Sequence, residues 1–592
     1  MNSLYSKHRN RIGFIAVALI VIFMVLAGRL FFVQIYMHRE YAEIVNSKSK
    51  LKMDISGSRG IIFDRNGVPL TKNLTHYTLW VDTQGKIDRN DISMYLSAIF
   101  DKSPQYYLGK MNKESRYLVL EKNILDPQIA GIRRDLKKLN IQIGDNTKRY
   151  YPYSDLASQV IGFTDTESQG AIGIECQFNS VLSGRRGTKE MTRNSTGRLQ
   201  TDIYADQPYL SNGLDITLTL DISYQAILQD ELQQACKATD AKGANGLIID
   251  PFTGEILAMA SYPGFDPNNY SYYPVETYQN QVISMTYEPG STYKIVAISA
   301  GLENGLISPW QTYDCENGEY QLYNRTFHDH EKYEILTVSE ILMHSSNIGM
   351  VKIASNIGSL DVYKYSKRYG FGEPAGIQLP HENGGILRDF GIWTKTSGAT
   401  IAIGQELAVT TLQTALSYCV ISNGGYLVMP NIIREISGNR QVQEFRYRPQ
   451  AIRRVISPQT ADAIMTMLRG VILEGTADKA RITGFPIAGK TSTAQKYIGD
   501  KYSKTEFISA FVGIFPIDLP QFVCVVAVDS PIYGRHWGNE TAAPIVKKVI
   551  ERIMGYTDEN FMKMMESPSD ENETHQIQRF SLQTKSIERN GS

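Results

Sequence analysis

An uninterrupted apolar stretch near the N-terminus is the strongest hydrophobic signal in the chain. No charged residue occurs from Ile12 to Gly28, and beyond Arg29 the apolar character continues to Met37. A helix over residues 12–37 is long enough to cross about 30 Å of hydrocarbon. We therefore predict one membrane-spanning helix. A signal peptide cleaved near Ala27 is the alternative, but the apolar stretch continues well past that point, which favours a retained anchor.

Basic residues precede this stretch and set its expected orientation. Lys7, Arg9 and Arg11 lie on its N-terminal side, and positive charge accumulates on the cytoplasmic side of membrane proteins. We therefore expect residues 1–11 in the cytoplasm, and the large part that follows the helix on the outer side of the cell membrane.

Residues 38–210 are polar and contain many turn signals. The tetrapeptide Asp64–Gly67 separates two short apolar segments, and glycines cluster at 170–173 and 184–187. This pattern favours a β-rich, elongated region rather than a compact enzyme core.

The pattern changes near residue 210. Residues 214–220 alternate as in a strand, and residues 221–238 have helical spacing. Further strands are expected at 246–251, 255–260, 507–515 and 522–529, and a closing helix at 542–554. Because strands at both ends enclose a mainly helical middle, we predict an α+β (α/β) domain over residues 211–556 whose ends meet in one sheet. The polar residues 557–592 are expected to form a disordered tail.

Composition narrows the function classes. The 592 residues carry 61 Lys and Arg against 61 Asp and Glu, so no charge excess indicates a nucleic-acid partner. The five cysteines lack CxxC spacing and the nine histidines form no ligand cluster, so no metal site is expected. His328 and His330, on either side of Asp329, are interpreted as loop polar groups. No glycine-rich nucleotide loop is found, and no cofactor is expected.

The candidate chemistry begins after Pro289–Gly290. Ser291 and Lys294 are three residues apart, so they share one face of a helix. The lysine can accept the serine proton only when it is uncharged, and both burial and the positive end of the helix dipole lower its pKa. The same helix end offers N–H groups to a developing oxyanion. Residues 47–50 have the same spacing but lack the Pro-Gly entry and the apolar helix.

Two further segments could complete a serine–lysine site. Ser345 and Asn347 could present a hydroxyl and an amide to one cleft, where a group must relay a proton and another must hold the substrate. Residues 490–493, with the sequence Lys-Thr-Ser-Thr, add a cationic and hydroxyl-bearing edge after an apolar strand.

Three motifs in the order Ser-x-x-Lys, Ser-x-Asn and Lys-Thr-(Gly) resemble those of the penicillin-recognising serine acyl-enzymes. With its N-terminal anchor, the chain resembles a class B, monofunctional penicillin-binding protein of the division type. The resemblance extends to residues 59–67, 149–152, 162–163 and 173–175. It implies one transmembrane helix, a β-rich pedestal of the dimerisation type over 38–210, and a penicillin-recognising transpeptidase domain over 211–556.

The resemblance implies a catalytic role for each motif. Ser291 would be the nucleophile that forms an acyl-enzyme with a D-Ala-D-Ala stem peptide, and Lys294 would be its general base. Ser345 would relay a proton, and Lys490 would tune that relay electrostatically. Asn347 would hold the substrate amide.

The resemblance also implies how the substrate is held. Thr491 would bind the terminal carboxylate, and the oxyanion hole would use the backbone N–H groups of Ser291 and Thr493.

Two residues depart from the family pattern: Ser492 replaces a glycine of the third motif, and Glu406 replaces the second glycine of a Gly-Gln-Gly box. Because glycine lets substrate backbone approach a strand, the Ser492 side chain must point away or narrow the cleft.

The partners that the resemblance implies are peptidoglycan stem peptides, β-lactam antibiotics, and a SEDS-type glycan polymerase with other division membrane proteins. Septal cell-wall synthesis is the first choice of role, with sporulation or elongation as the runner-up. The alternatives are a β-lactam sensor or non-catalytic scaffold of the cell-wall machinery, and a D,D-carboxypeptidase or β-lactamase, which would share the three motifs.

Overall fold

The computed structural model describes residues 2–41, 50–83, 87–115, 117–184, 186–193, 199–201, 212–438, 445–499 and 501–556. The chain divides into two compact units. One consists of Met1–Ser58 with Gly184–Gly213, and the other of Arg59–Ser183 with Leu214–Ser592. The tail predicted at 557–592 lies outside the described residues.

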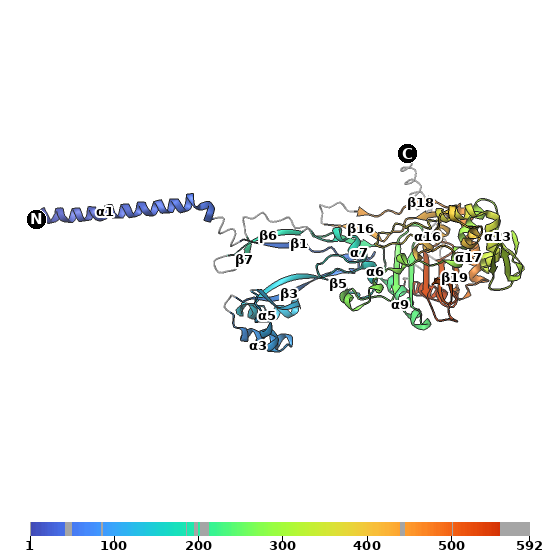
Figure 1. Cartoon of the computed structure of the whole chain (residues 1–592), viewed down its shortest axis with the longest axis horizontal. Coiled ribbons are helices and arrows are strands. Elements are labelled where there is room, and N and C mark those ends of the chain that lie inside the picture. The colour runs from blue at the N-terminus through green and yellow to red at the C-terminus, as the bar shows by residue number, and fades with distance from the viewer. Residues whose placement is uncertain are drawn as a thin grey trace, which may run out of the picture. The chain divides into compact units, whose positions relative to one another are not determined.

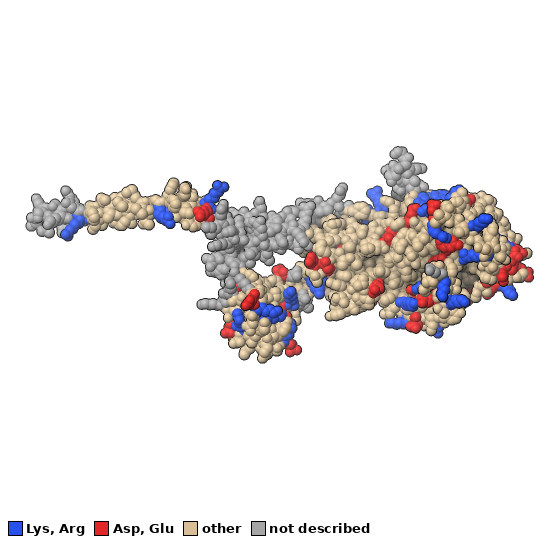
Figure 2. Space-filling view, viewed as in Figure 1, with Lys and Arg blue, Asp and Glu red and all other residues tan. Residues whose placement is uncertain are grey.

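The first unit contains the apolar helix. Helix α1 (Asn2–Phe31) continues into a π-helical turn, η1 (Phe32–Tyr36). Its segment Arg11–Tyr36 is long and apolar enough to cross a membrane and is not buried in the protein. Figure 2 shows long stretches of this helix without a charged side chain. The helix predicted over 12–37 is therefore confirmed, and its composition fits a membrane anchor.

The same unit contains a small antiparallel sheet. Strand β1 (Lys50–Ser56) pairs with β6 (Arg186–Arg193), which in turn pairs with β7 (Leu199–Thr201). This sheet thus joins a segment that precedes residues 59–183 in the sequence with two segments that follow them.

The pedestal residues of the second unit contain more helix than the sequence pattern predicted. A sheet of β3 (Lys72–Asp82), β4 (Tyr117–Leu125) and β5 (Gln142–Tyr150) packs with α3 (Arg89–Phe100), α4 (Pro104–Met111) and α5 (Asp126–Lys138). Leu79, Leu96, Leu120 and Leu136 are fully buried in their shared core. The residues Asp88 and Ser103–Pro104 cap helices α3 and α4, although such residues also mark turns. The turn-rich pattern therefore did not predict these helices.

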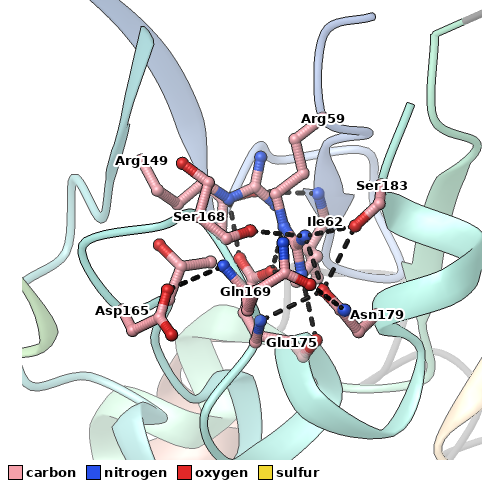
Figure 3. Close-up of polar contacts among 12 residues, drawn as sticks. Arg59, Ile62, Arg149, Asp165, Ser168, Gln169, Glu175, Asn179 and Ser183 are labelled. Atoms are coloured by element: carbon pink, nitrogen blue, oxygen red, sulfur yellow. Dashed lines mark hydrogen bonds and ion pairs between the residues drawn. The ribbon is translucent and has the colours of Figure 1, made fainter. Parts of the chain in front are cut away.

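A buried ionic cluster joins the pedestal segments that resemble the family motifs (Figure 3). The fully buried Glu175 accepts hydrogen bonds from Nε of Arg59 and Nε of Arg149, both at 2.6 Å. Arg59 also donates to Oδ1 of Asn179 at 2.8 Å and to the carbonyl of Ser168 at 3.2 Å. One carboxylate thus joins three segments that are distant in the sequence, and the charges it faces make its removal costly.

The α+β domain predicted over residues 211–556 is built on a five-stranded antiparallel sheet. Its strand order is β10 (Ile256–Tyr262), β9 (Gly243–Ile249), β21 (Phe522–Asp529), β20 (Lys501–Phe515) and β19 (Ala488–Ile498). Strand β9 lies near the start of the domain and pairs with β21 near its end. This confirms that the two ends of the domain meet in one sheet.

Helices cover both faces of this sheet; Figure 1 labels two of them, α9 (Ile222–Thr239) and α16 (Thr411–Ser422). Alternate residues of β21 enter different cores: Val523 and Val525 face one, and Cys524 and Val526 face the other. Helices α9 and α18 (Ala542–Tyr556) contribute to the second core, and α16 to the first. Successive residues of a strand point to opposite faces of the sheet, and here both faces are buried. These strands are therefore apolar at almost every position.

The strand predicted at 214–220 forms, but in another sheet. Strand β8 (Asp215–Leu218) pairs in parallel with β2 (Ile62–Phe63) of the pedestal and antiparallel with β16 (Ile433–Ser437). The pairing of β8 with β2 connects the pedestal directly to the predicted α+β domain. Periodicity predicts a strand but not its partner.

Candidate active site

Ser291 and Lys294 lie at the start of a helix that is buried on all sides. A 3-10 turn, η4 (Gly290–Tyr293), leads into α11 (Lys294–Glu303), and the first eight residues of α11 are buried. The Lys294 side chain has no exposed surface. Because the apolar helix α11 is packed on all sides, it holds the Ser291 and Lys294 side chains in fixed positions.

The hydroxyl of Ser345 connects these two residues. Ser345 Oγ and Ser291 Oγ are joined by a hydrogen bond of 2.8 Å, and Lys294 Nζ donates to Ser345 Oγ at 3.2 Å. Within the described residues, no hydrogen bond joins Lys294 Nζ directly to Ser291 Oγ. The geometry therefore offers a proton path from Ser291 through Ser345 to Lys294, rather than a direct transfer.

The environment of Lys294 favours its uncharged form. Burial lowers the pKa of Lys294 to about 7, although the nearby Asp329 carboxylate opposes the shift. Its amine donates to Asn347 Oδ1 at 2.9 Å and to the Ser346 carbonyl at 3.3 Å. About half of the molecules then carry a neutral amine near pH 7, which is the form that accepts a proton.

Asp329 orders the Ser-x-Asn segment, a role that the sequence did not reveal. Its carboxylate accepts the Asn347 N–H, the Ile348 N–H at 3.1 Å and the Ser346 hydroxyl at 2.6 Å. These groups lie at the start of α13 (Asn347–Ile357), where an anion is stabilised. An aspartate between two loop histidines gives no periodic signal, so only the three-dimensional contact shows its function.

The third motif lies on β19, which Figure 1 labels and which is at the edge of the five-stranded sheet. This strand contacts η4, the turn that carries Ser291. An edge strand leaves backbone donors and acceptors on its outer side for an added peptide strand. Lys490 is fully buried, and burial together with the neighbouring Lys294 amine lowers its pKa well below the usual value. Thr491 Oγ1 lies 3.1 Å from Thr476 Oγ1, and Thr493 Oγ1 accepts the Gly538 N–H at 2.9 Å.

The Ser492 hydroxyl points toward the turn that carries Ser291 (residues 289–293, the nucleophile turn). Its hydroxyl donates to the Pro289 carbonyl at 2.7 Å, and the residue is 3% exposed. Gly290 makes room for it: a Cβ added at Gly290, where φ is +53°, would lie 2.5 Å from Ser492 Oγ. The serine that replaces the family glycine is therefore accommodated by the missing side chain of Gly290.

This contact predicts the effect of a methyl group at position 290. Gly290→Ala combines a left-handed backbone angle with a collision at Ser492 Oγ, and we expect the rate of labelling by a fluorescent penicillin to fall at least about tenfold. The double variant Gly290→Ala/Ser492→Gly removes the collision and should recover part of that rate. Equal rates in the single and double variants would contradict this packing.

The motif residues converge on one cleft of about 350 Å³. Six of the eight predicted site residues line it: Ser291, Ser345, Asn347, Thr491, Ser492 and Thr493. The two lysines do not line the cleft and are buried. His330 and Trp537 form part of its wall, with ring centroids 4.7 Å apart. Aromatic walls of this kind give no motif that spacing alone could predict.

Comparisons with known proteins agree with this architecture. Residues 246–551 match the family model of the penicillin binding protein transpeptidase domain, which covers more than half of the chain. The chain belongs to the penicillin-binding protein transpeptidase family. Residues 54–218 match the model of the penicillin-binding protein dimerisation domain, which agrees with the pedestal preceding the catalytic domain.

Two relatives and one solved structure extend the comparison across most of the chain. Stage V sporulation protein D of Bacillus subtilis is 30% identical over 92% of this chain and 85% of its own length. Peptidoglycan D,D-transpeptidase FtsI of Escherichia coli is 28% identical over 89% of both chains. Penicillin-binding protein 3 of Mycobacterium tuberculosis, solved with aztreonam, is 26% identical, with a TM-score of 0.67 over 85% of this chain and 97% of its own.

Proposed function

We propose that this penicillin-binding protein is a peptidoglycan D,D-transpeptidase that cross-links stem peptides through an acyl-enzyme on Ser291. The observation that carries the proposal is the hydrogen-bonded series from Ser291 Oγ through Ser345 Oγ to Lys294 Nζ, in a cleft beside the edge strand β19. The relative FtsI is named a peptidoglycan D,D-transpeptidase, which supports this reaction, and the relative stage V sporulation protein D supports the runner-up role in sporulation.

In the first half-reaction, Ser291 Oγ attacks the carbonyl of the penultimate D-Ala. Its proton passes to Ser345 Oγ, whose own proton passes to the neutral amine of Lys294. The tetrahedral intermediate then collapses, the peptide bond breaks, and the terminal D-Ala leaves as an amine that takes a proton back along the same path. The product is an ester between Ser291 and the donor peptide.

In the second half-reaction, the amine of a neighbouring stem peptide attacks this ester. The amine loses a proton to the Ser345–Lys294 path, the ester bond breaks, and Ser291 Oγ regains a proton. A new amide bond joins the two peptides. A β-lactam would acylate the same hydroxyl: its ring C–N bond breaks, the ring nitrogen takes a proton, and an ester of the opened ring remains on Ser291, which would account for penicillin binding.

The remaining motif residues are assigned to binding the donor stem peptide. Asn347 Nδ2 already donates to the His328 carbonyl at 3.0 Å, so its amide is fixed where it can meet the substrate amide. Thr491 would bind the terminal carboxylate, and the N–H groups of Ser291 and Thr493 would stabilise the oxyanion. Lys490 would tune the Ser345 relay electrostatically; burial and the neighbouring Lys294 amine lower its pKa.

The domain limits, topology and partners belong to the same proposal. Residues 1–11 would be cytoplasmic, 12–37 would span the membrane, 38–210 would form the pedestal, and 211–556 would be the outer catalytic domain. The basic residues before the helix support this orientation. A SEDS-type glycan polymerase would bind the anchor and pedestal, with septal synthesis as the first choice of role.

The test locates the acyl group and its fate. Full-length protein in detergent is treated with a penicillin, digested, and its adduct located by peptide mass; the peptide should contain Ser291. Protein supplied with D-Ala-D-Ala stem peptides and an amine acceptor should release D-Ala and form a cross-linked dimer. Release of D-Ala with hydrolysis alone would identify a carboxypeptidase, and an adduct without turnover would identify a sensor or scaffold.

A further inference from the structure

Glu406 occupies a backbone position that ordinarily requires glycine. Its φ is +62°, a left-handed angle that strains a residue with a side chain. The Gly-Gln-Gly box of the family has glycine at this position, so the Glu406 carboxylate is an additional group in this chain. Such strain persists only where surrounding contacts hold the residue in place.

Four side chains hold the Glu406 carboxylate, which is 18% exposed. Oε1 accepts hydrogen bonds from Thr400 Oγ1 at 2.6 Å and from Arg325 Nη1 at 3.3 Å. Oε2 accepts from Arg388 Nη2 at 2.5 Å and from Ser397 Oγ at 3.0 Å. Two arginines that are far apart in the sequence thus share one carboxylate, a strong charge-assisted arrangement.

On one side, this residue contacts the nucleophile turn. The Glu406 N–H donates to Glu288 Oε1 at 2.9 Å, and Glu288 directly precedes the Pro289–Gly290 entry to Ser291. The Gly290 N–H donates to the Gly404 carbonyl at 3.1 Å. The box 404–406 is therefore attached to the backbone that presents the nucleophile.

On the other side, Arg325 leads to the Ser-x-Asn segment. It begins strand β13 (Arg325–His328), and its guanidinium also donates through Nη2 to Gln405 Oε1 at 2.8 Å. At the other end of this strand, the His328 carbonyl accepts from Asn347 Nδ2, and Asp329 holds the Asn347 N–H. One short strand therefore separates the Glu406–Arg325 pair from the residues that fix Asn347.

We propose that Glu406 is a positioning residue that, through Arg325, holds the nucleophile turn and the Ser-x-Asn segment at the separation needed for proton transfer between Ser291, Ser345 and Lys294. This inference rests on the proposed acylation of Ser291. The pair touches no reacting atom. Its effect is on the alignment of two segments that approach the same cleft from different parts of the chain.

The test separates covalent acylation from initial binding. Full-length wild type, Glu406→Gln, Arg325→Gln and the double variant are mixed with a fluorescent penicillin, and the acylation rate constant and the dissociation constant of the preceding complex are measured. Each single variant should acylate about tenfold more slowly, with a dissociation constant within about twofold of wild type. The double variant should be no slower than either single one, because the two side chains act as a pair.

Two controls distinguish positioning from general stability. Arg388→Gln removes the other arginine from the same carboxylate but does not involve strand β13, so its acylation rate should stay within about twofold of wild type even where its melting temperature falls. Glu406→Gly relieves the backbone strain but removes the carboxylate, so it should acylate as slowly as Glu406→Gln.

Three results would overturn the inference. They are wild-type acylation in Glu406→Gly, an equal loss in Arg388→Gln and Arg325→Gln, or fully additive losses in the double variant. A wild-type protein that fails to acylate at all would instead refute the proposed function, so the two failures are distinguishable.

Discussion

Replacing Ser291 with alanine is expected to abolish covalent labelling by penicillin, with a loss in acylation rate of at least about 10⁴-fold. The hydroxyl of Ser291 is the atom that becomes acylated, and Ser345 Oγ, 2.8 Å away, is placed as the relay between Ser291 and Lys294. Labelling is measured by fluorescence after denaturing electrophoresis, and folding by thermal unfolding.

The chain offers a matched control for this variant. Ser47 stands in the second Ser-x-x-Lys match, so Ser47→Ala removes a serine of the same motif spacing. It should be labelled at the wild-type rate. Labelling that survives in Ser291→Ala, or that disappears in Ser47→Ala, would place the reactive serine elsewhere.

Replacing Lys294 with methionine is expected to slow acylation about 10³-fold while the protein stays folded. Methionine keeps the volume of the side chain but cannot accept a proton. Methionine leaves the Ser346 carbonyl and Asn347 Oδ1 without this donor, so we also expect a stability loss on the order of 1–3 kcal/mol, and the assay temperature is kept below the melting temperature of the variant. Rates come from stopped-flow mixing with a chromogenic β-lactam.

Lys352→Met is the control for this second variant. Lys352 lies on α13, and its amine pairs with Glu316 at 2.6 Å, outside the cleft residues. It should acylate at the wild-type rate. A Lys294→Met protein that is folded at the assay temperature and still acylates within tenfold of the wild-type rate would exclude Lys294 as the base.

The parts of the site that lie within one element could be predicted from the sequence. Ser291 and Lys294 share a helical turn, and residues 490–493 lie on the single strand β19, so spacing and neighbouring apolar residues were sufficient. The contact between Ser345 and Ser291 joins residues 54 positions apart. It depends on how α11 packs near α13, and only the family resemblance pointed to it.

Other features could not be predicted, because their function arises from packing between distant segments. Asp329 stabilises the start of α13 only after the loop folds against that helix. Glu406 stood out as a departure from the family box, but its contact with Arg325 crosses 81 positions. In the pedestal, the capping residues of α3 and α4 resemble turn residues locally, so the helices emerged only with their buried core.

The pH dependence of the acylation rate tests the central claim most directly, namely that an uncharged Lys294 accepts the Ser291 proton through Ser345. With a pKa of about 7, the neutral fraction of Lys294 rises from about one tenth at pH 6 to about nine tenths at pH 8. The rate in wild type should therefore rise with pH, reach half its maximum near pH 7, and level off above about pH 8. A rate that is flat from pH 5 to 9, or one that still rises tenfold per unit above pH 8, would contradict the account.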